Sequence, residues 1–242
     1  MTKDIAVVTG ASGGLGRAIA RVLHEKSQGR LRLALHAHRN PKSAQELSRL
    51  IPKSFVVTAD LSTGEGRRAL LEQVLSQGQP KVLVNNAGID KPYEAALLIK
   101  EESFDRLFSV NLKAPAFLMK LFGKEMMRSG GGVIVNISSA LAHHALTGSG
   151  LYRATKAALE ELTKQFACEL GRAQVRVNAV SPGFIETPMT ADVPAPVRER
   201  IRGAAALQRL ATPESVALAV WQLVDNDALT GVVLAVDGGM DL

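Results

Sequence analysis

Short runs of apolar residues alternate along the chain with longer segments in which apolar positions recur with the period of a helix. Runs that are apolar at nearly every position are typical of strands buried on both faces of a parallel sheet. We expect such strands at residues 5–9, 31–36, 54–59, 81–84, 133–137, 174–180 and 232–236. We expect helices at residues 17–25, 43–51, 66–76, 101–110, 114–129 and 213–224, and another that begins at Tyr152.

This alternation of strands and helices predicts an α/β fold of the doubly wound Rossmann type, with about seven mostly parallel strands and helices on both faces. The 242 residues, 46% of them hydrophobic, suit one large domain better than two small ones. We therefore assign residues 1–242 to a single domain. No linker, low-complexity tract or internal repeat interrupts the pattern.

The sequence shows no sign of a membrane segment, a disulfide or a metal site. No apolar run approaches the roughly 18 residues of a membrane helix, and the first predicted strand follows Met1 closely, so we expect no signal peptide. The single cysteine, Cys168, fits a cytoplasmic protein, and we expect it to be buried in its helix. The five histidines lack metal-ligand spacing, and the adjacent His143 and His144 fall in a loop.

The first predicted strand ends in a glycine-rich turn that leads directly into a helix. Glycines let the backbone approach a pyrophosphate closely, and the helix N-terminus offers free N–H groups to it. The spacing differs from the better-known G-x-G-x-x-G, but the strand before it and the helix after it favour a dinucleotide site. The turn residues that we expect to contact the cofactor are Gly10, Ser12, Gly13, Gly14, Leu15 and Gly16.

The end of the second predicted strand indicates which cofactor is bound. A site that prefers NAD usually places a carboxylate there to bind the ribose hydroxyls. Residues 35–40 contain no acidic residue. Arg39, together with His38, can instead bind a 2′-phosphate through charge-assisted hydrogen bonds. The sequence therefore predicts NADPH (NADP+) rather than NADH, with an Arg39 that points into water as the alternative.

Tyr152 and Lys156 form a candidate acid/base pair. Positions four apart lie on one face of a helix, so the two side chains project together. A phenol has an ordinary pKa of about 10, and an ammonium group beside it favours the phenolate, so we expect a lowered Tyr152 pKa. Such a group can transfer a proton near neutral pH. Ser139, before the loop that leads to Tyr152, can hydrogen-bond the same oxygen.

Taken together, these motifs resemble those of the short-chain dehydrogenase/reductase family, and the resemblance covers essentially the whole chain. The similarity is carried by the glycine turn after Thr9, by the segment 85–88 (Asn-Asn-Ala-Gly), by Pro182-Gly183 with Thr187, and by a complete tetrad. The tetrad positions are Asn111, Ser139, Tyr152 and Lys156.

The resemblance implies a role for each of these residues. Tyr152 would be the general acid/base, Ser139 would position the substrate carbonyl, and Lys156 would bind the nicotinamide ribose while lowering the Tyr152 pKa. Asn111 would hold a water in the proton relay, and Thr187 would bind the carboxamide. The remaining cofactor contacts would come from Asp60 and Leu61 at the adenine and from Asn86, Ala87, Gly88, Pro182, Gly183 and Ile185.

Within the family, the sequence is most similar to β-ketoacyl-(acyl-carrier-protein) reductases, in residues 85–89, 182–187 and 236–240. This similarity implies reduction of a β-ketoacyl thioester on an acyl carrier protein, a homotetramer, and a substrate lid at about residues 183–210. Relatives that act on free ketones, alcohols or sugars share every motif, so that activity stays the alternative. A dinucleotide-sensing regulatory protein would need no acid/base set. One departure is Gly13, where NADP-dependent relatives often have a basic residue.

The formal net charge of +6 is concentrated in two regions, residues 1–60 and residues 196–209. Such an excess attracts a phosphorylated cofactor or an acidic partner. With 4% aromatic residues there is no stacking set for nucleic acid, so nucleic-acid binding would rest on charge alone. We expect Arg128, Arg172 and the 198–209 arginines to surround the entrance of the site and to steer an acidic carrier protein, with scattered surface charges as the alternative.

Overall fold

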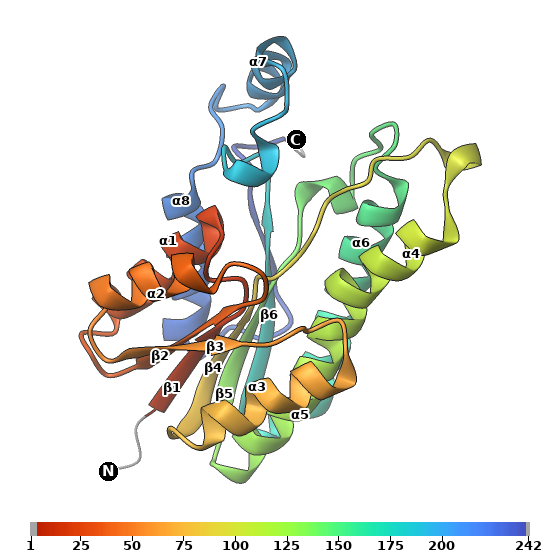
Figure 1. Ribbon diagram of the computed structural model, residues 1–242. Coiled ribbons are helices and arrows are strands. Elements are labelled where there is room, and N and C mark those ends of the chain that lie inside the picture. Colours follow the sequence, from red (N-terminus) through yellow and green to blue (C-terminus); the bar gives the residue numbers. More distant parts are fainter. Residues whose placement is uncertain (1–3, 241–242) are drawn as a thin grey trace.

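The computed structural model describes residues 4–240 and contains one seven-stranded sheet in the order β3-β2-β1-β4-β5-β6-β7 (Figure 1). Every neighbouring pair is parallel, so the predicted doubly wound Rossmann-type fold is confirmed, with a sheet that is entirely parallel. The strands are β1 (Asp4–Val8), β2 (Arg32–Ala37), β3 (Ser54–Thr58), β4 (Gln79–Asn85), β5 (Gly132–Ile137), β6 (Val175–Pro182) and β7 (Val233–Val236).

Helices cover both faces of this sheet (Figure 1). One face carries α1 (Gly14–Lys26), α2 (Pro41–Leu50) and α8 (Pro213–Asp225). The other carries α3 (Gly64–Leu75), α4 (Glu101–Phe108), α5 (Ala114–Arg128) and α6 (Gly150–Leu170). Helix α7 (Ala195–Ala204) stands apart, beyond the carboxyl ends of the strands. Short helical turns are η1 (Ala96–Leu98), η2 (Ser109–Lys113), η3 (Ala140–Ala142), η4 (Gly171–Ala173) and η5 (Pro188–Thr190).

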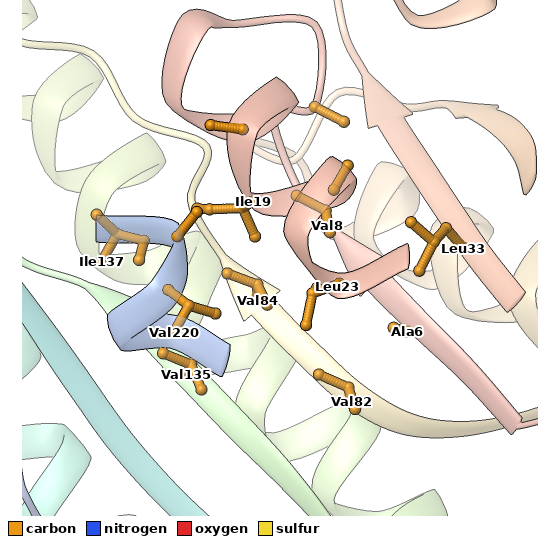
Figure 2. Packing of buried hydrophobic residues seen from close by; sticks show 14 of the residues in the cluster. Ala6, Val8, Ile19, Leu23, Leu33, Val82, Val84, Val135, Ile137 and Val220 are labelled. Carbon is orange, nitrogen blue, oxygen red and sulfur yellow. The ribbon is translucent and has the colours of Figure 1, made fainter. Parts of the chain in front are cut away.

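The apolar strands divide their side chains between two cores. Successive residues of a strand point to opposite faces, so Val8 joins the cluster under α1 and α8 while Val7 joins the cluster under α3, α5 and α6. Figure 2 shows the first cluster, in which Ile19 and Val220 of α1 and α8 meet the sheet. Phe122 is the largest fully buried side chain of the described residues and lies in the second. Burial on both faces explains why the strands read as unbroken apolar runs.

Three local expectations were wrong. Helix α7 was not predicted: its residues follow a proline-rich segment, and none of them is buried. The predicted helix at 101–110 ends at Phe108 and continues as a π-helical turn, η2. Cys168 is exposed, because it lies on α6 beside Ala167, which takes the buried position.

Parallel strands place all their carboxyl ends at one edge of the sheet, and the strand order reverses between β1 and β4. Ligands of open α/β sheets bind at such a reversal. The helices run back toward the opposite edge, so the start of α6 lies at the carboxyl edge and its end lies about 30 Å away. Arg128 and Arg172 follow the ends of α5 and α6 and therefore lie at the far edge, so the expectation that they surround the entrance is wrong.

Among residues 4–240, no helix is both long and apolar enough to cross a membrane. Within the same range, no cluster of His, Cys, Asp and Glu side chains has the arrangement of a metal site.

Candidate active site

The glycine turn between β1 and α1 has no room for side chains at its two ends. Gly10 has φ +65°, a conformation that favours glycine. A Cβ at Gly16 would lie 2.3 Å from the Gly10 carbonyl oxygen, so the first turn of α1 packs directly on the loop. The main chain is thereby exposed to a ligand at the N-terminus of α1, where backbone N–H groups have no helical partner. This cradle fits the pyrophosphate of a dinucleotide.

His36, in β2, supports this turn through contacts of its ring nitrogens. The sequence analysis did not identify it. The Gly10 N–H donates to its Nδ1 at 3.2 Å, and its Nε2 lies 3.0 Å from the Ala59 carbonyl oxygen. Because Nδ1 accepts, the proton of the neutral ring sits on Nε2 and is donated to Ala59. Burial lowers the pKa of His36, which keeps the ring neutral. The signal was a polar residue inside an otherwise apolar strand.

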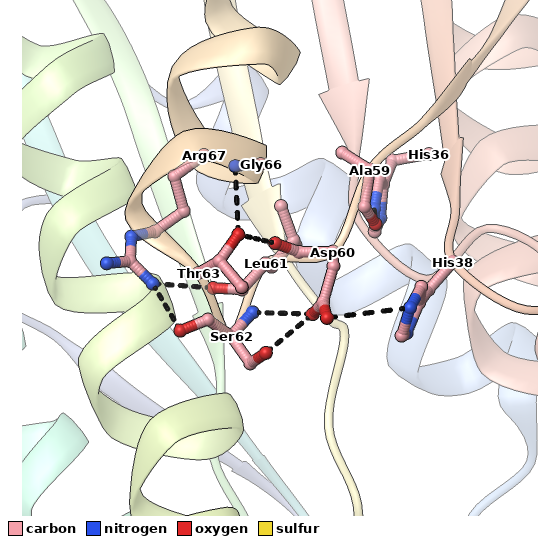
Figure 3. A network of polar contacts seen from close by, with 9 residues as sticks. All are labelled: His36, His38, Ala59, Asp60, Leu61, Ser62, Thr63, Gly66 and Arg67. Atoms are coloured by element: carbon pink, nitrogen blue, oxygen red, sulfur yellow. Dashed lines mark hydrogen bonds and ion pairs between the residues drawn. The ribbon is translucent and has the colours of Figure 1, made fainter.

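The carboxyl ends of β2 and β3 form the edge of the site where an adenosine would lie (Figure 3). Asp60 accepts from the N–H and the hydroxyl of Ser62 at 2.9 and 2.7 Å, and these bonds lower its pKa. His38 lies 3.7 Å from the same carboxylate, and Arg39 is exposed beside it. Leu61 is buried. No acidic residue follows β2 directly, as predicted.

The segment after β4 is fixed against the glycine turn by Thr9. Its hydroxyl accepts from the N–H groups of Asn86 and Ala87 at 2.9 and 3.0 Å, and Asn86 Nδ2 donates to the Thr9 carbonyl oxygen at 2.8 Å. Gly88 follows, and a Cβ there would lie 3.2 Å from Asn111 Oδ1 and 3.7 Å from Lys156 Nζ. The structure therefore brings the predicted residues 86–88 next to two members of the tetrad.

Asn111 lies in the π-helical turn η2, buried against the loop after β4. Its Nδ2 donates to the Ile89 carbonyl oxygen at 2.7 Å, and the Ile89 N–H donates to its Oδ1 at 2.9 Å. Turns of this kind occur frequently at functional sites. Within the chain, the amide of Asn111 thus fixes the Ile89 backbone.

Tyr152 is the centre of the tetrad, and the side chain of Ser139 lies close enough to its hydroxyl group to influence its pKa. Burial raises the pKa of Tyr152 to about 12, the Ser139 hydrogen bond opposes this rise, and the nearby Asp90 carboxylate adds to it. The lowered pKa that the sequence predicted is therefore wrong for the chain by itself. At neutral pH the phenol is protonated, which is the state required of a proton donor.

Lys156 is 5% exposed and lies beneath Tyr152, with its Nζ 5.6 Å from the centre of the phenol ring. The ammonium donates to the Ile137 carbonyl oxygen at 2.7 Å. Burial lowers its pKa to about 8, and the Glu160 carboxylate opposes this shift. Lys156 therefore does not depress the Tyr152 pKa as expected, because its own charge is weakened by burial and is directed at a backbone carbonyl.

The segment after β6 returns to the glycine turn. A Cβ at Gly14 would lie 3.1 Å from Pro188 and 3.3 Å from Thr187, so the two ends of the predicted cofactor site meet. Pro182 ends β6, and Ile185 is buried and forms a bridge to Ala211. Gly183 packs against the backbone of Asp237, where a Cβ would lie 2.8 Å from its Cα.

Several polar residues around Tyr152 were not identified from the sequence. Tyr93 donates to Asp90 at 3.1 Å, and the Asp90 carboxylate contributes to the raised pKa of Tyr152. His143 Nε2 lies 2.9 Å from Oε2 of the buried Glu160. Asp90 follows Gly88 closely in the sequence, and that proximity was the available signal.

Comparison with known proteins agrees with this geometry. The family model described as enoyl-(acyl carrier protein) reductase matches residues 10–241. The chain is 37% identical to 4-formylbenzenesulfonate dehydrogenase TsaC1/TsaC2 of Comamonas testosteroni, over 100% of this chain and 99% of that protein. It is 36% identical to the 3-oxoacyl-[acyl-carrier-protein] reductase FabG of Pseudomonas aeruginosa, over 98% of this chain and 96% of that protein.

A solved structure shares the complete fold. The 3-ketoacyl-(acyl-carrier-protein) reductase from Brucella melitensis, complexed with NADH, superposes with a TM-score of 0.91 at 30% identity, covering 100% of this chain and 99% of that one. A family model over nearly the whole chain, several relatives of matching length and a shared seven-stranded sheet lead to one conclusion: the chain belongs to the short-chain dehydrogenase/reductase family of oxidoreductases, which act on alcohols and ketones.

Proposed function

We propose that the protein reduces the ketone of a β-ketoacyl thioester to the alcohol with NADPH, and that Tyr152 is the general acid. The observation that carries this proposal is that the Ser139 and Tyr152 hydroxyl groups come together next to the buried Lys156. All three residues lie at the carboxyl edge of the sheet, beside the glycine turn. Two hydroxyl groups that meet at one point can both hydrogen-bond a single carbonyl oxygen.

The residues present fit a dinucleotide. The glycine turn would receive the pyrophosphate, because Gly10 and Gly16 let its backbone pack closely at the N-terminus of α1, where N–H groups have no helical partner. Asp60 and Leu61 would border the adenine, Lys156 would hold the nicotinamide ribose, and the carboxamide would meet Thr187. The complete set comprises Gly10, Ser12, Gly13, Gly14, Leu15, Gly16, His38, Arg39, Asp60, Leu61, Asn86, Ala87, Gly88, Tyr152, Lys156, Pro182, Gly183, Ile185 and Thr187. When bound, NADPH supplies the hydride that the carbonyl carbon accepts.

The chain supplies the proton and the orientation. Ser139 and Tyr152 would hold the carbonyl oxygen, and the Tyr152 hydroxyl would pass its proton to that oxygen as negative charge develops on it. A protonated phenol with a raised pKa is held in the donor state throughout the neutral range. Lys156 would hold the nicotinamide ribose beside Tyr152, and Asn111 would connect the site to water.

The preference for NADPH rests on the end of β2. His38 and Arg39 are exposed where a 2′-phosphate would lie, and no acidic residue follows β2 directly. Asp60 is the nearest acid, and its charge is shared with Ser62 and His38. Arg39 would bind the phosphate bidentately. Gly13 contributes no charge, so Arg39 carries the preference.

The thioester substrate is supported by two of the compared proteins, the Pseudomonas and Brucella reductases. Segment 183–210, which includes α7, would serve as the substrate lid, since its residues Thr187 and Pro188 lie beside Gly14. The Comamonas relative is named for a free aromatic aldehyde, which favours a reductase or dehydrogenase of a free carbonyl compound as the second candidate.

A single, exposed thiol, Cys168, fits the cytoplasm.

An acyl carrier protein would approach α7. Arg128 and Arg172 are too distant, but Arg198, Arg200 and Arg202 lie on the lid at the catalytic edge. Two of them have acidic neighbours, Arg198 with Glu186 at 3.6 Å and Arg202 with Glu199 at 3.2 Å. The surplus positive charge of this helix would steer an acidic carrier in a salt-dependent way.

We also propose a homotetramer. Large apolar side chains remain exposed on α4 and α5, with Phe104 and Phe117 each 43% exposed and Met127 45% exposed. Helices with apolar residues beyond the stripe that faces their own core commonly pack against a second copy.

The substrate proposal is tested by following NADPH oxidation with acetoacetyl thioesters, free ketones, aldehydes and sugars side by side, each at several salt concentrations. We expect the thioester to have the highest kcat/KM and a carrier-bound thioester to exceed a short mimic at low salt. Equal or better turnover of free carbonyl compounds would replace the thioester with the second candidate.

A further inference from the structure

Glu160 is a buried carboxylate that the proposed chemistry does not use. It is 4% exposed and lies on α6 one turn after Lys156 and two turns after Tyr152. Isolated buried carboxylates are costly, so such a group requires partners. Both of its oxygens have one. Ser138 donates its hydroxyl to Oε1 at 2.5 Å, and His143 Nε2 lies 2.9 Å from Oε2.

These two partners lie on either side of Ser139 in the sequence. Ser138 immediately precedes it at the end of β5, and His143 follows the short turn η3. The two oxygens of Glu160 therefore bracket residues 139–142. Lys156 binds the Ile137 carbonyl oxygen, and Arg153 Nε donates to the Leu141 carbonyl oxygen at 2.7 Å, both also from α6. Of the α6 residues Arg153, Lys156 and Glu160, Glu160 is the one that contacts residues on both sides of segment 139–142.

The same carboxylate acts on Lys156 through space. Burial disfavours the ammonium form of Lys156, and the negative charge of Glu160 opposes that effect. The charged and titratable groups facing Glu160 are Lys156 on its own helix, His143 on the loop, and the exposed Lys164 one turn further, which also pairs with Glu161 at 2.6 Å. Of these, Lys156 lies beside Tyr152.

We propose that Glu160 is a positioning residue for this active site: it fixes Ser139 through Ser138 and His143, and it places a carboxylate one helical turn from Lys156. The inference rests on the proposed roles of Ser139 and Lys156. It places no contact between Glu160 and the substrate. It requires that the influence on Lys156 be lost when the charge of Glu160 is removed, and that only the positioning of the loop be lost when His143 is removed.

The test compares Glu160→Gln with Glu161→Gln, which is the same substitution on the adjacent, 73% exposed residue. Glutamine keeps a hydrogen-bonding group of the same size but removes the charge. The Lys156 pKa is read from its Cε resonance by carbon-13 NMR, assigned with Lys156→Met. We expect Glu160→Gln to lower this pKa by about one unit, the low end for loss of an opposite charge. The high-pH limb of the kcat profile should move down with it, and Glu161→Gln should leave both unchanged.

The His143→Ala variant tests whether the contacts of Glu160 on either side of residues 139–142 position Ser139. We expect a fall of about tenfold in kcat/KM for the carbonyl substrate, with unchanged NADPH affinity and an unchanged high-pH limb. This variant carries the test if Glu160→Gln does not fold. A Lys156 pKa and a pH profile that are the same in Glu160→Gln as in the wild type, with only a lower melting temperature, would overturn the proposal. Normal turnover by His143→Ala would overturn it as well.

Failure of the proposed function would be recognised separately. A wild-type protein that does not reduce the thioester refutes that substrate, and the pH profiles are then measured with whichever carbonyl compound it reduces. The NMR measurement of Lys156 needs no substrate at all.

Discussion

The tight packing of the glycine turn predicts a large effect of a single methyl group. Ordinary van der Waals contact of a Cβ begins at 3.4 Å, and a Cβ at Gly16 would lie 2.3 Å from the Gly10 carbonyl oxygen and 2.9 Å from Ala11 Cα. Both atoms belong to the backbone of the turn, so relief requires the turn to move. Overpacking of this kind costs about 1–3 kcal/mol.

If this cost falls on the conformation that binds the cofactor, Gly16→Ala should weaken the binding of NADPH and NADH by about ten- to a hundredfold, at 1.4 kcal/mol for each factor of ten. The matched control is Gly171→Ala. No atom lies within 4 Å of a Cβ there, and the backbone is helical with φ −58°. The control should bind normally and be as stable as the wild type or slightly more stable.

Cofactor binding is measured by fluorescence titration and stability by thermal melting. Wild-type affinity in Gly16→Ala, or equal losses in Gly16→Ala and Gly171→Ala, would refute the argument that backbone packing in the turn positions the cofactor.

Three further predictions concern the cofactor, pH and assembly. Arg39→Ala should reduce the preference for NADPH over NADH by about tenfold or more, the value of one charge-assisted hydrogen bond. The control Arg49→Ala, on the exposed end of α2, should leave this preference unchanged. An unchanged ratio of kcat/KM values for the two cofactors in Arg39→Ala would exclude Arg39 as the phosphate ligand. The pKa of His36 is below its ordinary value of 6.5, so its contribution to stability is complete above that pH and is lost as the pH falls below it. Urea unfolding at pH 5 and 7 should show this loss, and His36→Gln should diminish it; an equal pH dependence in both proteins would contradict the assignment. Light scattering should give the mass of four chains, and a monomer mass would contradict the assembly.

The sequence predicted the features that depend on short spacing. The glycine turn, the helical pair Tyr152 and Lys156 and the apolar strands are each read from neighbouring residues, and the structure has them within a few residues of the predicted bounds. The direction of α5 and α6 also followed from a parallel sheet, and applying it would have excluded Arg128 and Arg172 from the entrance.

The features that were missed depend on contacts between distant segments. His36 joins β2 to the glycine turn and to β3, and Glu160 joins α6 to residues before and after Ser139. The pKa of Tyr152 could not be predicted from the Lys156 spacing, because burial of the phenol and the Asp90 carboxylate decide its direction. The effects of burial and of neighbouring charges on a pKa depend on the surroundings of the group in three dimensions.

The central claim is that Tyr152 donates the proton to the substrate carbonyl. The most direct measurement is single-turnover NADPH oxidation by Tyr152→Phe, alongside the NADPH dissociation constant of the same variant. Phenylalanine keeps the ring in its buried position and removes only the hydroxyl group. We predict a rate at least about 10²-fold below that of the wild type, the low end of general acid catalysis, with cofactor affinity unchanged. Turnover of Tyr152→Phe at the wild-type rate would contradict the claim.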